Sequence, residues 1–513
     1  MQNNDKKVLL RISNLKQYFP LKGGRFVKAN DGITLDIYEG ETFGLVGESG
    51  CGKSTLGRTI LQLYHQTYGR TMYYGRSLDD LAPKYVIDTV KNLKARRTKL
   101  RELEQKRDKL EADYAKLSEK EQYAKHGELD TARKLAEDAL LDITKIVGGF
   151  LVVDDLDPVI AAYSKDYAIA RKLSGMEEKR QELLVDVDDA EYAKKTAEEA
   201  GKSGKDGQLQ KAQEKLKQCD DQIAALRAQL DAGRKEIEAL RVPHANDPEF
   251  QKYEAYRDDG IDLARLEYNE MRRLRRDMQL IFQDPYSSLN PRMSVGQIIS
   301  EGMQAHNMIK KKDARMQEMV LKIMDDCGLA PYFLHRFPHQ FSGGQRQRIG
   351  IARALATKPK FVVCDEAVSA LDVSIQAQII NLLLDLKEQQ NLTYMFITHD
   401  LSVVKYISDR VGVMYLGTMV ELAAADEIFH HPIHPYTEAL LAAIPTTDIG
   451  ENRKELQILE GDIPSPVNPP KGCKFHTRCK YCTEICEQVV PEWKEVSENH
   501  FVACHHVLPE KHQ

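Results

Sequence analysis

The sequence contains little that would place the chain in a membrane or on nucleic acid. Its 513 residues include no run of about 18 apolar residues, so we expect no membrane-spanning segment. The N-terminus, MQNNDKKVLL, lacks a long apolar core and a cleavage site, so we expect no signal peptide. Lys and Arg total 73 against 78 Asp and Glu, and this near balance offers no electrostatic footprint for nucleic acid. These absences indicate a cytoplasmic protein.

Cysteine is scarce except near the C-terminus, where five of the nine cysteines fall. They are Cys473, Cys479, Cys482, Cys486 and Cys504. In a reducing compartment such a cluster indicates a metal or iron–sulfur site rather than disulfides. Thiolates at these spacings suit a tetrahedral metal ion or an iron–sulfur cluster.

The chain divides by composition into four segments. Residues 1–81 and 266–430 alternate apolar strand-like runs with helical stretches, which is typical of an α/β domain. Residues 82–265 are rich in Lys, Glu, Ala, Leu, Asp and Arg, and we expect them to be helical almost throughout. Residues 431–513 are rich in Pro and Cys. The sequence therefore predicts one α/β domain that is interrupted by a helical insertion and followed by a Cys-rich extension.

Two stretches of the insertion repeat with a spacing of alternately three and four residues. The first comprises Leu93, Arg96, Leu100, Leu103, Arg107, Leu110, Tyr114 and Leu117. The second comprises Leu209, Ala212, Leu216, Cys219, Ile223, Leu226, Leu230, Gly233, Ile237 and Leu240. This spacing keeps one seam facing a partner helix, so we expect the two stretches to form an antiparallel coiled-coil hairpin. A single solvated helix is the alternative.

Residues Gly47–Thr55, with the sequence GESGCGKST, fit the phosphate-loop pattern G-x-x-x-x-G-K-[ST]. They follow an apolar strand and open a helix, which is the context that this motif requires. The candidate nucleotide-binding residues here are Gly47, Glu48, Ser49, Gly50, Cys51, Gly52, Lys53, Ser54 and Thr55. Backbone N–H groups would surround the phosphates of ATP, Lys53 would reach the β- and γ-phosphates, and Ser54 would bind Mg²⁺.

Further motifs follow in order along the chain. The apolar run FVVCDE ends in Asp365, which we expect to hold Mg²⁺, and Glu366, which we expect to act as general base. In FSGGQ, small side chains and backbone donors suited to a γ-phosphate come before a helix. The remaining candidates are Gln283 after a strand, Ser342, Gly343, Gly344 and Gln345 in FSGGQ, Asp372 in SALD, and His399 in FITHD.

In this order the motifs resemble those of the nucleotide-binding subunits of ABC transporters. The resemblance implies an ABC-type ATPase in which two such domains pair head to tail, so that Lys53 and Ser342 of one chain serve two different ATP molecules. It assigns Gln283 to the Q-loop, where it contacts Mg²⁺ and takes part in catalysis, and His399 to the switch histidine. An aromatic ring upstream would stack on adenine; Phe19 is the first choice and Tyr18 the second, with a plain core position as the alternative for Phe19.

The flanking sequences narrow the resemblance. RRDMQLIFQDPYSSLNPRMSVGQII, HPYTEALLAAIP and GDIPSPVNPPKGCKFHTRC are similar to the oligopeptide/dipeptide importer ATPases, of the second of their two paired types. This implies a second ATPase subunit, two membrane permeases and an extracellular solute-binding protein as partners, with no nucleic acid. The chain would then lie at the cytoplasmic face of the cell membrane. Import of nickel or another small solute is the alternative, and a DNA-repair or chromosome-maintenance ATPase with a coiled coil, or a soluble ABC translation factor, is more remote.

The same resemblance bears on the cysteines. In that family four tail cysteines are associated with a [4Fe-4S] cluster, and the matching positions are Cys473, Cys479, Cys486 and Cys504. Cys482 departs from the family pattern and forms a CxxC pair with Cys479. Zinc and free thiols therefore stay open as alternatives to the cluster.

Overall fold

The computed structural model describes residues 6–117, 119–201, 206–310, 315–443 and 461–508. It forms two compact units, of which the first comprises Met1–Gly75 and Arg272–Gln513 and the second Arg76–Met271. Among the described residues, no helix combines the length and the apolar character needed to cross a bilayer.

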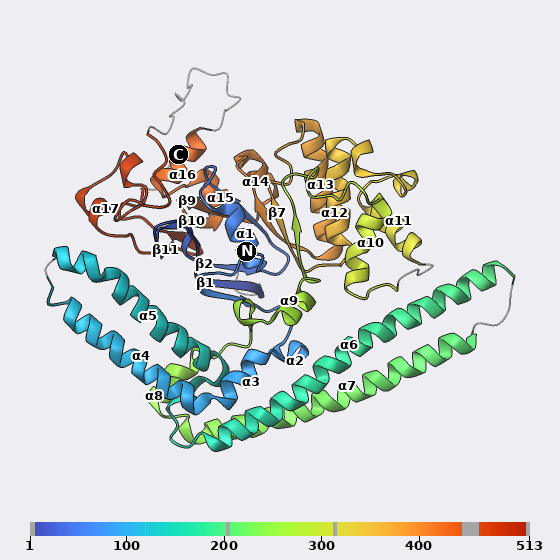
Figure 1. Cartoon of the computed structure of the whole chain (residues 1–513). Helices are drawn as coiled ribbons and strands as arrows, with labels where there is room; N and C mark the ends of the chain where they lie inside the picture. Colours follow the sequence, from blue (N-terminus) through green and yellow to red (C-terminus); the bar gives the residue numbers. More distant parts are fainter. Residues whose placement is uncertain (1–5, 118, 202–205, 311–314, 444–460, 509–513) are drawn as a thin grey trace. The chain divides into compact units, whose positions relative to one another are not determined.

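The first unit is built on two sheets (Figure 1). In the smaller one, β1 (Val8–Pro20) pairs antiparallel with β2 (Phe26–Tyr38) and with β4 (Tyr68–Tyr73). The larger sheet has the strand order β11-β12-β10-β9-β3-β8-β7-β6. Its strands are β3 (Thr42–Val46), β6 (Met278–Ile281), β7 (Phe361–Asp365), β8 (Thr393–Ile397), β9 (Arg410–Tyr415), β10 (Thr418–Ala424), β11 (Lys494–Ser497) and β12 (His500–Val502).

The five strands β9, β3, β8, β7 and β6 pair in parallel, and this determines where the site lies. Strands β3, β7 and β8 are buried along their whole length, as expected for parallel strands covered on both faces. The carboxyl ends of β3, β6, β7 and β8 share one edge, where ligands bind in open α/β sheets. The parallel α/β architecture agrees with the predicted fold class.

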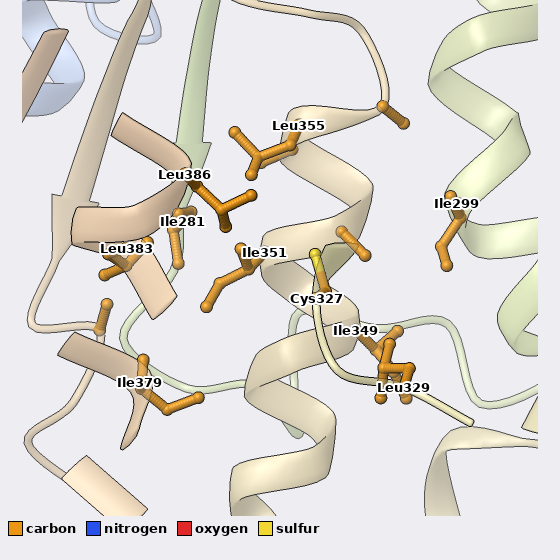
Figure 2. Close-up of a cluster of buried hydrophobic side chains, with 14 of the residues drawn as sticks. Ile281, Ile299, Cys327, Leu329, Ile349, Ile351, Leu355, Ile379, Leu383 and Leu386 are labelled. Carbon is orange, nitrogen blue, oxygen red and sulfur yellow. The ribbon is translucent and has the colours of Figure 1, made fainter. Parts of the chain in front are cut away.

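Helices surround this sheet, and those between Val295 and Ile407 build the largest core of the first unit. The surrounding helices are α1 (Lys53–Ile60), α10 (Val295–Ala305), α11 (Met316–Asp326), α12 (Gly343–Leu355), α13 (Val373–Gln390), α14 (Leu401–Ile407), α15 (Ala425–His430), α16 (Pro435–Ala442) and α17 (Glu484–Gln488). Figure 2 shows Ile351 and Leu355 of α12 near Leu383 and Leu386 of α13 and Ile281 of β6, all of them buried. This core supports the segments from which the FSGGQ and SALD motifs project.

We expect Leu383→Ala to destabilise the first unit by about 2–5 kcal/mol, because Leu383 is fully buried and a cavity would remain. Val373→Ala on the same helix is the control, since Val373 is 84% exposed and its loss should cost less than about 0.5 kcal/mol. Hydrogen exchange of the α12 and α13 amides measures both effects. Equal exchange rates in the two variants would contradict the packing described for Leu383.

The second unit consists mainly of helices, four of which are long. They are α2 (Leu78–Leu81), α3 (Lys84–Lys91), α4 (Leu93–Tyr114), α5 (Glu119–Val147), α6 (Asp157–Glu199), α7 (Asp206–Arg241) and α8 (Pro248–Glu254), with a short strand β5 (Ile261–Asp262). The last helix, α9 (Tyr268–Leu274), spans the boundary between the two units. Helix α4 packs on α5, and α6 packs on α7 (Figure 1).

The prediction of a single hairpin was wrong about which helices pair. Each predicted seam is the covered face of its helix: every seam position on α4 and α7 is buried or half-buried. The two arms, however, pair with α5 and α6 rather than with each other. The physical reason is the middle of the insertion, which is itself helical and gives each arm a partner across a short connection.

A buried ionic cluster joins α6 and α7 to neighbouring segments within the second unit. The Arg241 guanidinium pairs with the Glu254 carboxylate, donates to the Tyr163 hydroxyl at 2.6 Å and faces the Phe150 ring at 4.6 Å. Glu254 also accepts the Gly149 N–H at 2.9 Å. Burial raises the pKa of Tyr163 to about 12, so this hydroxyl stays protonated. The cluster joins segments from η2 (Gly148–Val152), α6, α7 and α8.

Candidate nucleotide-binding site

The phosphate loop, Gly47–Thr55, connects β3 to α1, and its glycines are required by its backbone. Gly47, Gly50 and Gly52 have φ angles of +149°, +80° and +104°, which favour glycine. A Cβ on Gly47 would lie 2.2 Å from the Met414 carbonyl oxygen, and one on Gly52 would lie 2.1 Å from the Ala29 carbonyl oxygen. The loop is therefore held tightly between β9 and β2.

The Lys53 ammonium lies inside this loop. Its Nζ donates to the carbonyl oxygens of Gly47 at 2.7 Å and Glu48 at 3.0 Å, and the side chain is buried. Cys51 Sγ lies 3.8 Å from the same nitrogen, and burial raises the pKa of its thiol. Ser49 and Gly50 are exposed at the tip of the loop, whereas Thr55 is half-buried in the first turn of α1. A cation ringed by backbone dipoles is suited to receive phosphate oxygens.

Asp365, at the end of β7, is fully buried, and two side chains of α1 donate hydrogen bonds to its carboxylate. Ser54 Oγ donates to Asp365 Oδ1 at 2.6 Å, and Arg58 Nη2 donates to Oδ2 at 3.1 Å. A hydroxyl and a carboxylate side by side supply the oxygen ligands that Mg²⁺ prefers, so these residues fit the metal that was predicted for them. Arg58 was missed by the sequence interpretation, although its i+4 spacing from Ser54 places both on one face of a helix.

Glu366 is the point at which three strand ends meet. Gln283, after β6, donates its Nε2 to Glu366 Oε2 at 2.6 Å, and His399 Nδ1, after β8, lies 3.5 Å from Oε1. Glu366 has a φ of +47°, and its N–H is bonded to the Ile397 carbonyl. Its side chain is 14% exposed. A non-glycine residue held in this strained conformation indicates a functional position.

The FSGGQ segment forms a second group of candidate residues. Ser342 caps α12: its Oγ accepts the Gln345 N–H, and the Gln345 side chain accepts the Ser342 N–H. A Cβ on Gly344 would lie 2.4 Å from Ile375 Cγ2, while Gly343 and Ser342 are exposed.

Asp372, the N-cap residue of α13, is exposed as well. No hydrogen bond between described residues joins this second group to the phosphate loop. One chain therefore brings together Lys53, Ser54, Asp365, Glu366, Gln283 and His399, but not the FSGGQ and SALD residues.

The predicted adenine-stacking ring, Phe19, is half-buried near the end of β1. It packs edge to face against Tyr64, with ring centroids 5.4 Å apart. Tyr18, the second choice, instead donates its hydroxyl to the Asp31 carboxylate and faces the Lys28 ammonium. Tyr64 was not identified from the sequence, because nothing in its neighbourhood marks it as part of a site.

The four tail cysteines that were predicted as ligands line one pocket. Cys473, Cys479, Cys486 and Cys504 surround it, together with His434, Phe475 and other residues, whereas Cys482 does not. Burial raises the pKa of the Cys473 and Cys504 thiols to about 11. Across the part of the chain that the structure describes, no three His, Cys, Asp or Glu side chains are arranged to hold one metal ion.

The tail also contacts the phosphate loop, which the sequence interpretation did not anticipate. Arg478, next to Cys479, pairs with the Glu48 carboxylate, and Tyr436 of α16 accepts the Glu48 N–H at 2.9 Å. Burial raises the pKa of Tyr436, which keeps this hydroxyl neutral. These contacts join residues far apart in the chain, so no local pattern could have indicated them.

Two family models match the chain. The one described as "ABC transporter" matches residues 30–237 and 251–369, and the one described as "Oligopeptide/dipeptide transporter, C-terminal region" matches residues 420–486.

Curated relatives match as well. The oligopeptide transport ATP-binding protein AppF of Bacillus subtilis is 52% identical over 250 residues, covering 48% of this chain and 75% of that protein. The putative oligopeptide transport ATP-binding protein YkfD of Bacillus subtilis is 34% identical over 498 residues, covering 97% and 95%. A putative peptide import ATP-binding protein of Brucella ovis is 54% identical over 246 residues, covering 48% and 77%. Among solved structures, the ATP-binding cassette MJ0796 with ADP and Pi matches with 15% identity and a TM-score of 0.42, covering 81% and 99%.

Proposed function

This chain belongs to the ATP-binding proteins of the ABC transporter family, in its oligopeptide/dipeptide group, and we propose that it hydrolyses ATP to drive peptide import. The observation that carries the proposal is the convergence at one sheet edge: Ser54 on Asp365, and Gln283 and His399 on Glu366. These contacts link both halves of the interrupted α/β domain.

ATP binding would use the phosphate loop and the start of α1. The Lys53 ammonium would exchange its bonds to the Gly47 and Glu48 carbonyls for β- and γ-phosphate oxygens. Ser54 and Asp365, already in contact, would hold Mg²⁺ together with the Gln283 amide oxygen. When bound, this ion neutralises charge on the phosphates. Phe19, supported by Tyr64, would stack on adenine.

Hydrolysis would depend on Glu366 as general base. Its carboxylate is oriented by the Gln283 amide on one oxygen and lies close to His399 on the other, so it is held ready to accept a proton from the attacking water. The His399 imidazole would in turn approach the γ-phosphate. These three side chains extend from β6, β7 and β8, whose mutual registers are set by the parallel sheet.

A second ATPase subunit would complete each site. Ser342, Gly343, Gly344, Gln345 and Asp372 form the second group on this chain, and we propose that they close on the ATP of the partner in a head-to-tail heterodimer. The exposed N-terminus of α12 supports this assignment, because its backbone donors and positive dipole end suit a phosphate.

The transport complex would contain two membrane permeases and an extracellular solute-binding protein, with this chain at the cytoplasmic face of the membrane. Peptides are favoured over nickel as cargo because the C-terminal region matches the oligopeptide/dipeptide description over residues 420–486.

The test of cargo is uptake of labelled dipeptides, longer oligopeptides and Ni²⁺ by cells that express the complete complex with the wild-type chain or with Glu366→Gln. We expect peptide uptake to depend on Glu366. Uptake of Ni²⁺ alone would assign the chain to the nickel alternative, and ATP turnover stimulated by DNA, without uptake, would favour the DNA-repair class.

For the insertion, residues 82–265, we propose that the pairs α4–α5 and α6–α7 are two antiparallel coiled coils. The covered positions of α4 and α7 recur at alternating spacings of three and four residues, which is the repeat of such structures. This arrangement differs from the predicted single hairpin, because the two predicted arms, α4 and α7, pair with α5 and α6 and not with each other.

We further propose that Cys473, Cys479, Cys486 and Cys504 hold a [4Fe-4S] cluster. The four thiols line one pocket, and four cysteine thiolates are the ligand set of such a cluster. A bound cluster would supply redox-active iron, while the chain's own part is to present four thiolates.

Anaerobically purified protein should therefore contain about four irons per chain. Cys479→Ser should lose most of this iron, because one of the four ligands is removed, while Cys482→Ser should keep it, because Cys482 does not line the pocket. Metal analysis of the three proteins makes the measurement. Zinc in place of iron, or equal iron loss in both variants, would refute the assignment.

A further inference from the structure

Glu48, the second residue of the phosphate loop, is bonded through every polar group it has. Its carboxylate accepts two hydrogen bonds from Arg478, at 2.8 and 3.0 Å. Its N–H donates to the Tyr436 hydroxyl at 2.9 Å, and its carbonyl accepts from Lys53 Nζ at 3.0 Å. Glu48 therefore links the phosphate-binding lysine directly to the C-terminal extension.

The Arg478–Glu48 pair is well shielded from water. The Arg478 side chain is 4% exposed and the Glu48 side chain 20% exposed. Two parallel N–H···O bonds between a guanidinium and a carboxylate determine orientation as well as distance. The pair can thus transmit a displacement of the extension to the phosphate loop.

On the side of the extension, Arg478 is anchored in a rigid turn between two pocket cysteines. It ends the 3₁₀ helix η7 (His476–Arg478), and its N–H donates to the Phe475 carbonyl. The Phe475 ring packs on the rings of Tyr415 and Tyr436, with centroids 5.2 and 5.3 Å apart. At the other end of the turn, Lys474 Nζ donates to the Asp31 carboxylate at 3.0 Å.

We propose that Arg478 is a positioning residue of the ATP site, and that through Glu48 it couples the turn Cys473–Cys479 to nucleotide binding. The inference rests on ATP binding at the phosphate loop, as proposed above, but not on the transported solute or on what occupies the cysteine pocket. Arg478 does not touch ATP; it orients and neutralises Glu48.

The charge balance explains why this positioning matters. ATP brings several negative charges to the loop, and the Glu48 carboxylate belongs to the same loop. With Arg478 in place, this carboxylate is paired; without it, a poorly solvated negative charge would oppose the phosphates.

The experiment measures the affinity of the purified full-length chain for MgATPγS. We expect Arg478→Gln to weaken binding by about tenfold, within the range of typical couplings between sites, and Arg478→Lys to weaken it less. Lys480→Gln is the matched control: it removes one positive charge from the same segment, but its partner is Glu438 on α16. Equal affinities of Arg478→Gln and Lys480→Gln would overturn the proposal.

A second substitution separates this role from a general loss of structure. If Arg478 acts by compensating Glu48, Glu48→Gln added to Arg478→Gln should recover most of the lost affinity. In the assembled ATPase, Arg478→Gln should raise the KM for ATP while kcat at saturating ATP changes by less than about twofold. A double variant as weak as Arg478→Gln would overturn the proposal. If Arg478→Gln fails to fold, Arg478→Lys with wild-type affinity would overturn it.

Coupling must act in both directions, which provides a readout independent of activity. In protein whose cysteine pocket holds no metal, bound MgATPγS should slow alkylation of Cys479 by N-ethylmaleimide in the wild type but not in Arg478→Gln. Peptide mass spectrometry follows the labelling. If the labelling rate of wild-type Cys479 is the same with and without the nucleotide, the proposal is overturned. Wild-type chain that fails to bind MgATPγS at all would instead contradict the proposed function.

Discussion

Glu366→Gln should lower ATP turnover by about 10²- to 10⁴-fold while ATP still binds. The amide has the shape of the carboxylate but cannot accept a proton from the attacking water. The residues that bind the nucleotide, above all Lys53 and Ser54, are untouched by the change. Because the ATP at the Glu366 site of a closed dimer would then stay bound, the variant should prolong the life of that dimer, which can be observed by size-exclusion chromatography with MgATP.

The control is Glu388→Gln on the exposed face of α13, which makes the same chemical change away from the sheet edge. Its turnover should equal that of the wild type. If the ATP site that contains the Glu366→Gln substitution hydrolyses ATP as fast as the wild type, Glu366 is not the general base. That result would leave His399, 3.5 Å from Glu366 Oε1, as the next residue to test.

Gly52→Ala should strongly weaken the binding of ATP. Gly52 has a φ of +104°, and an added Cβ would lie 2.1 Å from the Ala29 carbonyl oxygen, which belongs to the backbone of β2 and cannot give way cheaply. Strain of the backbone and the overlap together cost about 2–5 kcal/mol. Affinity for MgATPγS should therefore fall by more than about tenfold.

Gly50→Ala provides the comparison in the same loop. Gly50 also has a positive φ, of +80°, but nothing lies within 4 Å of where its Cβ would be. Only the conformational cost remains, about 1–2 kcal/mol, so this variant should bind ATP better than Gly52→Ala. If the two variants bind equally, contact with β2 does not constrain the loop.

Much of the candidate site could be predicted because its residues follow directly from local sequence. A strand, a glycine loop and a helix place Lys53 and Ser54 whatever the rest of the chain does. Asp365, Gln283 and His399 each follow an apolar run, and parallel strands bring such positions to one edge. The structure then adds contacts that depend on packing, such as Arg58 on Asp365.

What could not be predicted depends on tertiary contacts. Glu48 and Arg478 lie 430 positions apart, and neither has a neighbour that marks it as half of a pair. The helical arms illustrate the same limit: the heptads identify the covered faces of α4 and α7, but a seam does not specify its partner. Partner choice was decided by α5 and α6, whose own patterns were less regular.

The interruption of the α/β domain has a consequence for its synthesis. Strand β3 emerges from the ribosome long before β8 and β9, the strands that flank it in the sheet. Translation proceeds at about 5–20 residues per second, so the apolar segment TFGLV stays unpaired for tens of seconds before its neighbouring strands are made. During this time the helical insertion, whose contacts are mostly between adjacent helices, can fold first. The nascent chain thus carries an unpaired aggregation-prone strand for most of its translation, and we expect its yield to depend on chaperones that bind such segments.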